Sequence, residues 1–140
     1  MSATAVTGTW TLPFAGYLSF LAHRVVLDRL NSKKWVGDRS SPGDDPDKLE
    51  IDGRSHKNFL ENVPLAIALS AIAELNGANR RVLNYALAAL FVVRVLHVEA
   101  GIKRPEAMGN GRPVGFWGTQ AFIVGISGYT AWLVKAYWGF

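Results

Sequence analysis

The sequence predicts an all-α integral membrane protein, a bundle of four membrane-spanning helices, and three observations lead to it. The chain has 140 residues, the length of a single domain. Its hydrophobic fraction of 49% omits 14 glycines, and with them the apolar share exceeds the value of about 45–50% that is typical of soluble domains. The apolar residues gather in four segments close to the length of about 20 residues that crosses a hydrocarbon core.

The expected spans cover residues 9–28, 57–77, 82–100 and 114–138, with a long loop over 29–56. In the third span, residues 82–93 read VLNYALAALFVV, where only Asn84 is strongly polar. Residues 121–134 of the fourth, AFIVGISGYTAWLV, carry nothing more polar than Ser and Thr. A soluble bundle would show a polar stripe along each helix, so lipid suits these faces better than water. The mean hydropathy is only +0.12 because the stretch 28–58 is hydrophilic.

Local signals place the ends of these elements. The N-terminus lacks the basic segment of a secretory signal, so we expect the first apolar run to be retained as a span. Residues 52–58 offer caps for the second span, and Gly77 is expected to end it. The short NGANRR turn then makes the third span antiparallel to the second. The fourth closes with Tyr137, Trp138 and Phe140, aromatic residues suited to a membrane interface.

The distribution of cations predicts the topology. Ten cations lie in the loops after the first and third spans, against three on the opposite side: Arg29, Lys33, Lys34, Arg39, Lys48, Arg54, Lys57, Lys103, Arg104 and Arg112, against Arg80, Arg81 and Lys135. Basic loops tend to face the cytoplasm, so both termini are expected to face away from it. The other two of the 15 cations, Arg24 and Arg94, lie inside spans.

Several kinds of site have no support in the sequence. The chain has no cysteine, which excludes disulfides, a protein thiolate and Cys-based metal sites. Its three histidines lie on three segments without metal-ligand spacing, so no metal is expected. No glycine-rich phosphate loop follows a strand, and no basic helix is interleaved with stacking aromatics. We therefore expect no nucleic-acid partner.

Polar residues recur at one depth of the predicted bundle. Arg94 and His97 share a helix face near the cytoplasmic end of the third span. A charge at the centre of a bilayer helix costs about 2.5–3.5 kcal/mol, so such groups face a partner or a wet cavity. Snorkelling of Arg94 to the interface is the simpler explanation, and a shared polar pocket is the other.

The second span favours the shared pocket. Helical spacing places Arg54, Asn58 and Glu61 on one face, with Lys57 beside them. Glu61 is followed directly by the apolar part of the span, so its carboxylate needs a cationic partner. The candidates are Arg94, Arg24 of the first span and a cation of a neighbouring chain. These groups suit a small ligand with several carboxylates and an amine, because guanidinium binds carboxylate bidentately and Glu61 could take an ammonium.

Arg112 stands just before Pro113, at the cytoplasmic edge of the fourth span. A cation at this place could favour the thiolate of a bound thiol. A plain topological anchor explains it equally well.

Two motifs resemble those of the MAPEG family, membrane-associated proteins in eicosanoid and glutathione metabolism. RSHKNFLENVPLAI resembles the family signature R-x-H-x-N-x-x-E-x-x-P, with Arg54, His56, Asn58, Glu61 and Pro64 at its fixed positions. RVLH in the third span is similar to the family's R-x-x-H. Four spans with a long basic loop after the first also agree, so the resemblance covers nearly the whole chain.

The resemblance implies a homotrimer that binds glutathione, as co-substrate, between adjacent subunits at the cytoplasmic side. The implied glutathione ligands are Arg24 (or Arg29 instead), Arg54, Lys57, Asn58, Glu61, Arg94 and His97. Arg112, followed by Gly115, resembles the family's arginine that stabilises the glutathione thiolate, and His56 is expected to support the site. Gly101 and Phe116 stand where some eicosanoid-pathway members have Tyr, which argues against a synthase of that type.

The expected function is therefore a membrane-bound glutathione transferase, with peroxidase activity as a variant, that adds the thiolate to a lipophilic small molecule. The chain is similar to the shorter bacterial members, which implies a bacterial inner membrane. The alternative is a non-enzymatic trimeric membrane protein of the same fold whose basic pocket binds anionic lipid or an acidic partner. The sequence leaves both open.

Overall fold

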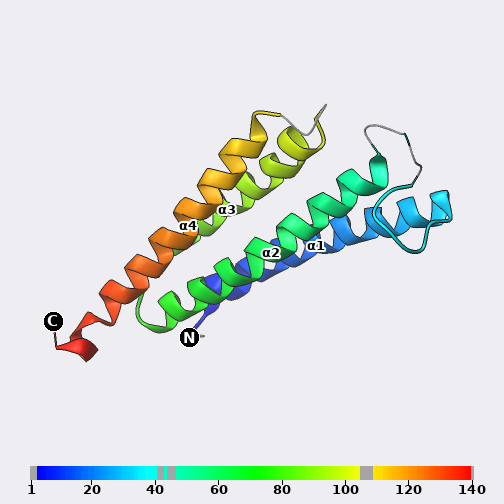
Figure 1. Cartoon of the computed structure of the whole chain (residues 1–140). Helices are drawn as coiled ribbons and strands as arrows, with labels where there is room; N and C mark the ends of the chain where they lie inside the picture. Colours follow the sequence, from blue (N-terminus) through cyan, green and yellow to red (C-terminus); the bar gives the residue numbers. More distant parts are fainter. Residues whose placement is uncertain (1–2, 41–42, 44–46, 105–108, 140) are drawn as a thin grey trace.

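The computed structural model describes residues 3–40, 43, 47–104 and 109–139. The elements are α1 (Ala5–Ser32), α2 (Lys48–Leu75), α3 (Arg80–His97), the π-helix η1 (Val98–Ile102), α4 (Gly111–Leu133) and the 3₁₀-helix η3 (Lys135–Trp138) (Figure 1). No strand occurs in the described residues, and the predicted all-α class with four long helices is confirmed. Residues 41–42 and 44–46 of the expected loop, and Phe140, lie outside the described residues.

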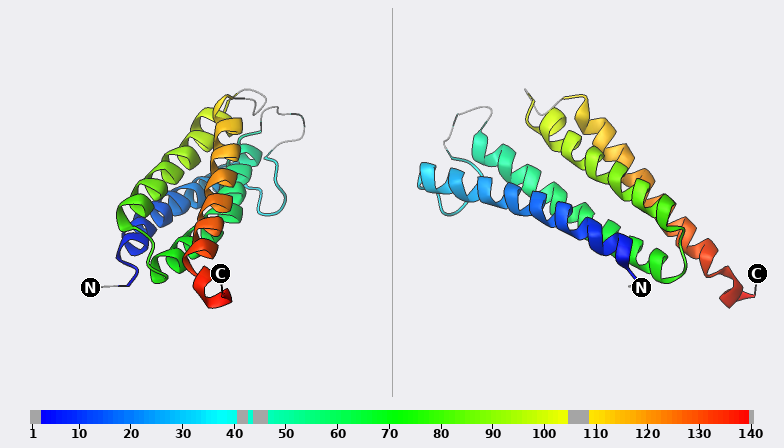
Figure 2. Two further views of the ribbon diagram at one scale, coloured as in Figure 1. Left: turned by 90° about the vertical axis from the view of Figure 1, so that its left-hand side faces the viewer. Right: turned by 180° about the vertical axis from the view of Figure 1, so that it is seen from behind.

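The four helices form two antiparallel hairpins, α1 with α2 and α3 with α4. α2 also packs against α4, and α1 against α3. The hairpins lie together near the α2–α3 turn and diverge toward the end at which α1 leads into α2 (Figures 1 and 2). This divergence separates the first half of α2 from the start of α4.

Aromatic side chains fill the centre of the bundle. Phe14 of α1 packs edge-on against Phe91 of α3 with ring centroids 5.3 Å apart, and Tyr17 meets Phe59 of α2 at 5.4 Å. Phe59 and the α3 residue Leu87 are fully buried. Such rings bury large areas and pack with defined geometry, so they fix how the two hairpins face each other.

Side-chain caps and one glycine set the helix ends. α2 begins at Lys48, earlier than the expected span, because the Asp47 carboxylate caps it by accepting from the Glu50 amide. The connection from α1 is correspondingly shorter than the expected loop 29–56. Gly77 takes a φ of +86° and ends α2 as predicted, and the Asn79 side chain caps α3 two residues later.

One buried carboxylate joins the far ends of the first hairpin. Glu74, near the end of α2, accepts hydrogen bonds from the Val6 and Thr7 amides at 2.9 and 2.8 Å, and from the Thr7 hydroxyl. The first amides of a helix have no partner within it, and a negative charge there is favourable. Glu74 therefore caps α1 from a different helix, a role that the sequence did not reveal.

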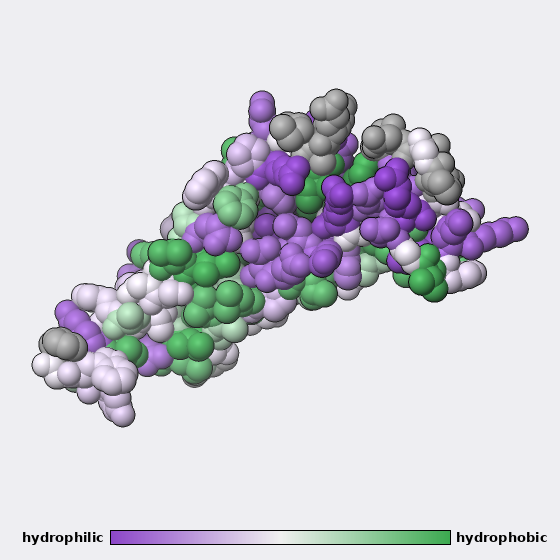
Figure 3. Space-filling view, viewed as in Figure 1, coloured by the Kyte–Doolittle hydropathy of each residue, from purple (hydrophilic) through white to green (hydrophobic). Residues whose placement is uncertain are grey.

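The outer surface of the bundle is apolar over much of its length. Leu12, Leu65, Tyr85 and Val124, one on each long helix, are exposed. Hydrophilic residues gather toward the end with the long connections, and hydrophobic ones predominate farther along (Figure 3). Among the described residues, Lys48–Leu75 and Arg80–Ile102 are long and apolar enough to cross a membrane by length and composition. That the four long helices cross a membrane stays a prediction.

Candidate functional site

A cavity of about 780 Å³ opens between α2 and the start of α4, near the end at which the hairpins diverge. Its lining, which we name the α2–α4 cavity, consists of Arg54, Lys57, Asn58, Glu61, His97, Ile102, Gly109, Asn110, Arg112, Pro113, Phe116 and Trp117. Six of the eight predicted site residues are in this set, and Arg24 and Arg94 are not. The structure thus brings together residues from α2, the end of α3 and the start of α4.

The α2 wall follows from helical spacing. Arg54, Asn58 and Glu61 are four and three positions apart on a continuous helix, so they share one face, as predicted. The exposed Arg54 guanidinium also forms an ion pair with Glu50, one turn earlier, at 2.5 Å. Such an exposed pair is worth only about 0.3–0.5 kcal/mol, so a ligand carboxylate could readily replace Glu50.

Among the described residues, Glu61 carries the one carboxylate that lines the α2–α4 cavity. Neither Arg94 nor Arg24 pairs with it, although both were candidate partners. Within the part of the chain that the structure describes, the Glu61 carboxylate has no ion pair or side-chain hydrogen bond. It is available to a ligand ammonium or to a cation of a neighbouring chain.

Arg94 lies behind the α2 wall. Its side chain is only 1% exposed. One Nη atom donates to Asn58 Oδ1 at 2.5 Å and the other to Thr119 Oγ1 at 3.3 Å, while the guanidinium lies 5.7 Å from the Phe59 ring centroid. Arg94 therefore joins α3 to α2 and α4, and it fixes the orientation of the Asn58 amide.

His97 links the end of α3 to the start of α4. Its Nδ1 lies 3.0 Å from the Arg112 carbonyl oxygen. A carbonyl only accepts hydrogen bonds, so Nδ1 must carry the proton, and the other ring nitrogen is the one free for a different partner. The contact fixes the backbone at Arg112, whose side chain is exposed at the cavity.

Two glycines allow this close approach. A Cβ on Gly115 would overlap the His97 ring, and a Cβ on Gly101 would come within about 2.5 Å of the Arg112 amide nitrogen. The absence of the Tyr that some family members carry at the place of Gly101 therefore has a packing reason. No side chain fits between η1 and α4 at this point.

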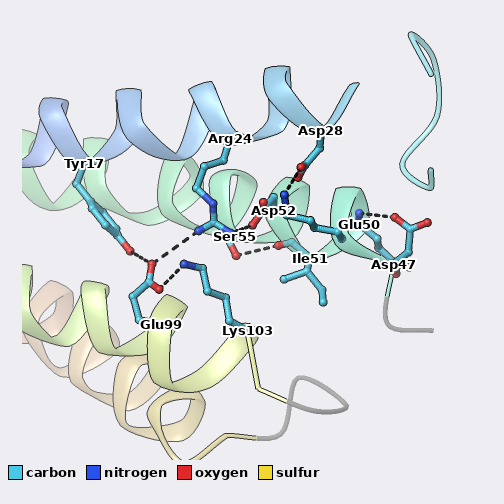
Figure 4. Close-up of polar contacts among 11 residues, drawn as sticks. Tyr17, Arg24, Asp28, Asp47, Glu50, Ile51, Asp52, Ser55, Glu99 and Lys103 are labelled. Atoms are coloured by element: carbon cyan, nitrogen blue, oxygen red, sulfur yellow. Dashed lines mark hydrogen bonds and ion pairs between the residues drawn. The ribbon is translucent and has the colours of Figure 1, made fainter. Parts of the chain in front are cut away.

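Arg24 belongs to a second group of polar residues, which we name the Arg24 cluster: Tyr17, Arg24, Asp52, Glu99 and Lys103. Arg24 pairs with the buried Asp52 and lies 3.8 Å from Glu99. Glu99 also accepts from the Tyr17 hydroxyl at 3.1 Å and pairs with Lys103 (Figure 4). Asp52 and Arg54 are two positions apart on α2, so the cluster and the cavity lie on different faces of that helix.

Sequence reasoning did not identify the partners in this cluster. Asp52 and Glu99 lie on different helices from Arg24, and no local spacing connects the three. The one available signal was that an arginine inside an apolar span needs a carboxylate partner. In the described residues, no group of three or more His, Cys, Asp or Glu side chains is arranged to hold a metal ion.

Comparison with known proteins yields one finding. The model of the MAPEG family matches residues 7–132. No curated protein and no solved structure matches the chain significantly. The matched range contains all four long helices almost completely, together with every residue of the cavity and of the Arg24 cluster. The family is membrane-associated and includes glutathione transferases and related proteins. This chain belongs to the MAPEG family, as its two sequence motifs predicted.

Proposed function

We propose that the protein is a membrane-bound, glutathione-dependent transferase that adds the glutathione thiolate to a lipophilic electrophile. The observation that carries the proposal is the composition of the α2–α4 cavity. It combines the cations Arg54, Lys57 and Arg112 with the carboxylate of Glu61, which has no ion pair among the described residues. Its volume of about 780 Å³ lies in the range of about 300–1,000 Å³ that is usual for small-molecule sites.

Glutathione matches these groups one by one. It has two carboxylates, one ammonium, two peptide groups and a thiol. Arg54 and Lys57 supply cations for the carboxylates, and Glu61 supplies an anion for the ammonium. The Asn58 amide, held by Arg94, can bind a peptide group of the ligand. His97 completes this wall through the ring edge that does not contact Arg112.

The proposed chemistry is thiolate addition. The bound thiol loses its proton to solvent, and the Arg112 guanidinium stabilises the sulfur anion. The sulfur electron pair then forms a carbon–sulfur bond with the electrophile, while the electron pair of the electrophile's attacked bond moves to the adjoining acceptor atom, which takes a proton from water, or leaves with a departing group. No covalent enzyme intermediate forms. The rate gain comes from charge stabilisation and from holding the two reactants together. Peroxidase activity would begin from the same thiolate.

The electrophile is assigned to the side of the cavity that meets lipid. Phe116 and Trp117 line the cavity, are exposed, and form an edge-to-face pair with ring centroids 5.2 Å apart. Apolar rings on a lipid-facing helix let a lipophilic molecule arrive laterally from the bilayer. In this arrangement the cavity opens at the cytoplasmic side, and the termini face the other side.

Arg24 is assigned to a different site within a homotrimer. It lies outside the α2–α4 cavity of its own chain. The family resemblance implies a glutathione site between adjacent subunits, so we assign Arg24 to the cavity of a neighbouring protomer. Its pair with Asp52 would then hold the guanidinium ready for the neighbour's ligand.

Absorbance of the thiolate on adding glutathione, followed by stopped flow, tests the mechanism. The wild-type protein should give a thiolate signal, and Arg112→Ala should lose it while still binding glutathione. Arg104→Ala is the matched control, since Arg104 is an exposed cation on the same side that does not line the cavity. A thiolate signal retained in Arg112→Ala would remove the activating role from that residue.

Thermal unfolding in detergent separates the transferase from the non-enzymatic alternative. A ligand that binds only the folded state must raise its stability, by about 2.7 kcal/mol at a concentration of 100 times Kd. Glutathione at millimolar concentration should therefore raise the Tm of the wild type, and less so that of Glu61→Gln. An unchanged Tm in both proteins would sink the transferase proposal and leave anionic lipid or an acidic partner as the ligand of the cavity.

A further inference from the structure

The turn that follows α1 exposes a mixed cationic and apolar surface. It comprises Lys33, Lys34, Trp35, Val36 and Gly37, and we name it the α1 tip. All five residues are exposed, with Trp35 at 68% and Val36 at 88%. In the described part of the chain, neither lysine forms an ion pair and Trp35 makes no ring contact. Two neighbouring apolar side chains with this much exposed surface, rimmed by cations, indicate a surface that contacts another molecule.

The α1 tip is a fixed turn. The Arg29 guanidinium donates to the carbonyl oxygens of Lys34 at 3.2 Å and Gly37 at 2.9 Å. Gly37 takes a φ of +93°, which favours glycine. Farther along, the amide and hydroxyl of Ser40 both donate to Asp47, the cap of α2. The chain is therefore anchored on both sides of the tip.

With α1 crossing the bilayer as the sequence predicts, its length puts the tip at the level of the lipid headgroups. A rise of about 1.5 Å per residue makes the expected span 9–28 about 30 Å long, the thickness of the hydrocarbon core. Ser32, the last residue of α1, then lies about 6 Å beyond the core. The headgroup layer on each side is about 5–7.5 Å thick. Lys33 to Gly37 follow directly, on the side that the cation count assigns to the cytoplasm.

We propose that the α1 tip is a binding site for anionic phospholipid headgroups of the cytoplasmic leaflet. Four cations, Arg29, Lys33, Lys34 and Arg39, lie within residues 29–39 against the single acid Asp38. The two unpaired lysines supply ammonium groups for lipid phosphates. Trp35 and Val36 supply an amphipathic ring and an aliphatic group that favour the boundary between headgroups and acyl chains. This site is separate from the α2–α4 cavity and does not depend on glutathione.

A single fluorescent label tests the site in the full-length protein. The chain has no cysteine, so Val36→Cys can carry one environment-sensitive fluorophore at the tip. The labelled protein is placed in nanodiscs of phosphatidylcholine with a rising fraction of phosphatidylglycerol. The emission should shift to the blue and saturate. Adding Lys34→Gln should raise the half-saturating fraction about fivefold, the factor expected for one lysine at an anionic surface.

Arg81→Gln is the control. It removes one exposed cation at the opposite end of the bundle and should leave the half-saturating fraction unchanged. The proposal is overturned if the emission wavelength does not change with the fraction of phosphatidylglycerol. It is also overturned if Lys34→Gln and Arg81→Gln raise the half-saturating fraction equally, which would indicate only general charge attraction. It is also overturned if inorganic phosphate reproduces the shift, or if the tip cysteines of two chains cross-link in pure phosphatidylcholine, since the occupant would then be a free anion or a second copy.

Discussion

Replacing Arg94 by Met tests whether this residue acts on the ligand through Asn58. Arg94 is buried behind the cavity wall and donates to Asn58 at 2.5 Å. Met keeps the apolar length of the side chain and removes the guanidinium. Thr119 loses little, because its hydroxyl still donates to the Gly115 carbonyl oxygen at 2.7 Å. Asn58 is the residue that loses its charged donor.

The size of the effect follows from that lost bond. A partly buried amide oxygen left without a donor costs about 1–3 kcal/mol, and the amide can avoid this cost by turning toward water. A turned Asn58 no longer offers its amide to glutathione in the bound geometry. If the whole cost falls on binding, the glutathione Kd rises by a factor of about 5 to 150. We expect Arg94→Met to lie within that range and to remain folded.

A double-mutant cycle by calorimetry in detergent measures this connection. Glutathione Kd values are needed for the wild type, Arg94→Met, Asn58→Ala and the double variant. If Arg94 acts through Asn58, Arg94→Met should add almost nothing to Asn58→Ala, giving a coupling free energy close to the full effect of Arg94→Met. Circular dichroism checks that each variant is helical. Additive effects would refute the reasoning and show that Arg94 contacts the ligand independently.

Three further changes have defined outcomes. Glu74→Gln should lower the free energy of unfolding by about 1–3 kcal/mol, measured by thermal unfolding, since a charged acceptor of three hydrogen bonds is lost. Gly115→Ala should cost about 1–3 kcal/mol by forcing a methyl group into the His97 ring, whereas Gly125→Ala, which meets nothing within 4 Å, should not destabilise. Equal melting temperatures for the two alanine variants would contradict the packing argument. Glu61→Gln should weaken glutathione binding about tenfold at unchanged stability, because its carboxylate has no partner among the described residues.

The α2 wall of the site was predictable because its geometry is local. Arg54, Asn58 and Glu61 share a face in any α-helix, and the family motif lies in the same segment. Arg94 and His97 lie in the last turn of α3, near the end of the helix that counting residues back from the basic loop indicated. That these residues meet on one side of the bundle needed only antiparallel neighbours joined by a short turn, which the sequence also indicated.

Contacts between distant residues could not be predicted. Glu74 caps α1 across a sequence separation of 67 residues, and no pattern near Glu74 distinguishes it from an exposed helix end. Arg94 was expected as a candidate partner of Glu61, yet its guanidinium donates to Asn58 instead. Arg24, the other candidate, forms its ion pair with Asp52. The partners of these side chains depend on how each helix is rotated about its axis and packed against its neighbours. The packing of the aromatic core sets that rotation, and helical periodicity does not reveal it.

The Arg94 guanidinium joins three helices, because it is carried by α3 and donates to Asn58 of α2 and Thr119 of α4. The distance between α2 and α4 is also the width of the cavity. If the cavity binds glutathione as proposed, a ligand that prefers one separation of α2 and α4 must shift the helices toward that separation, and a change in the separation must alter its affinity. Under the proposed function, we expect conditions that press the hairpins together or let them spread to alter glutathione affinity even where every ligand-contacting residue is unchanged.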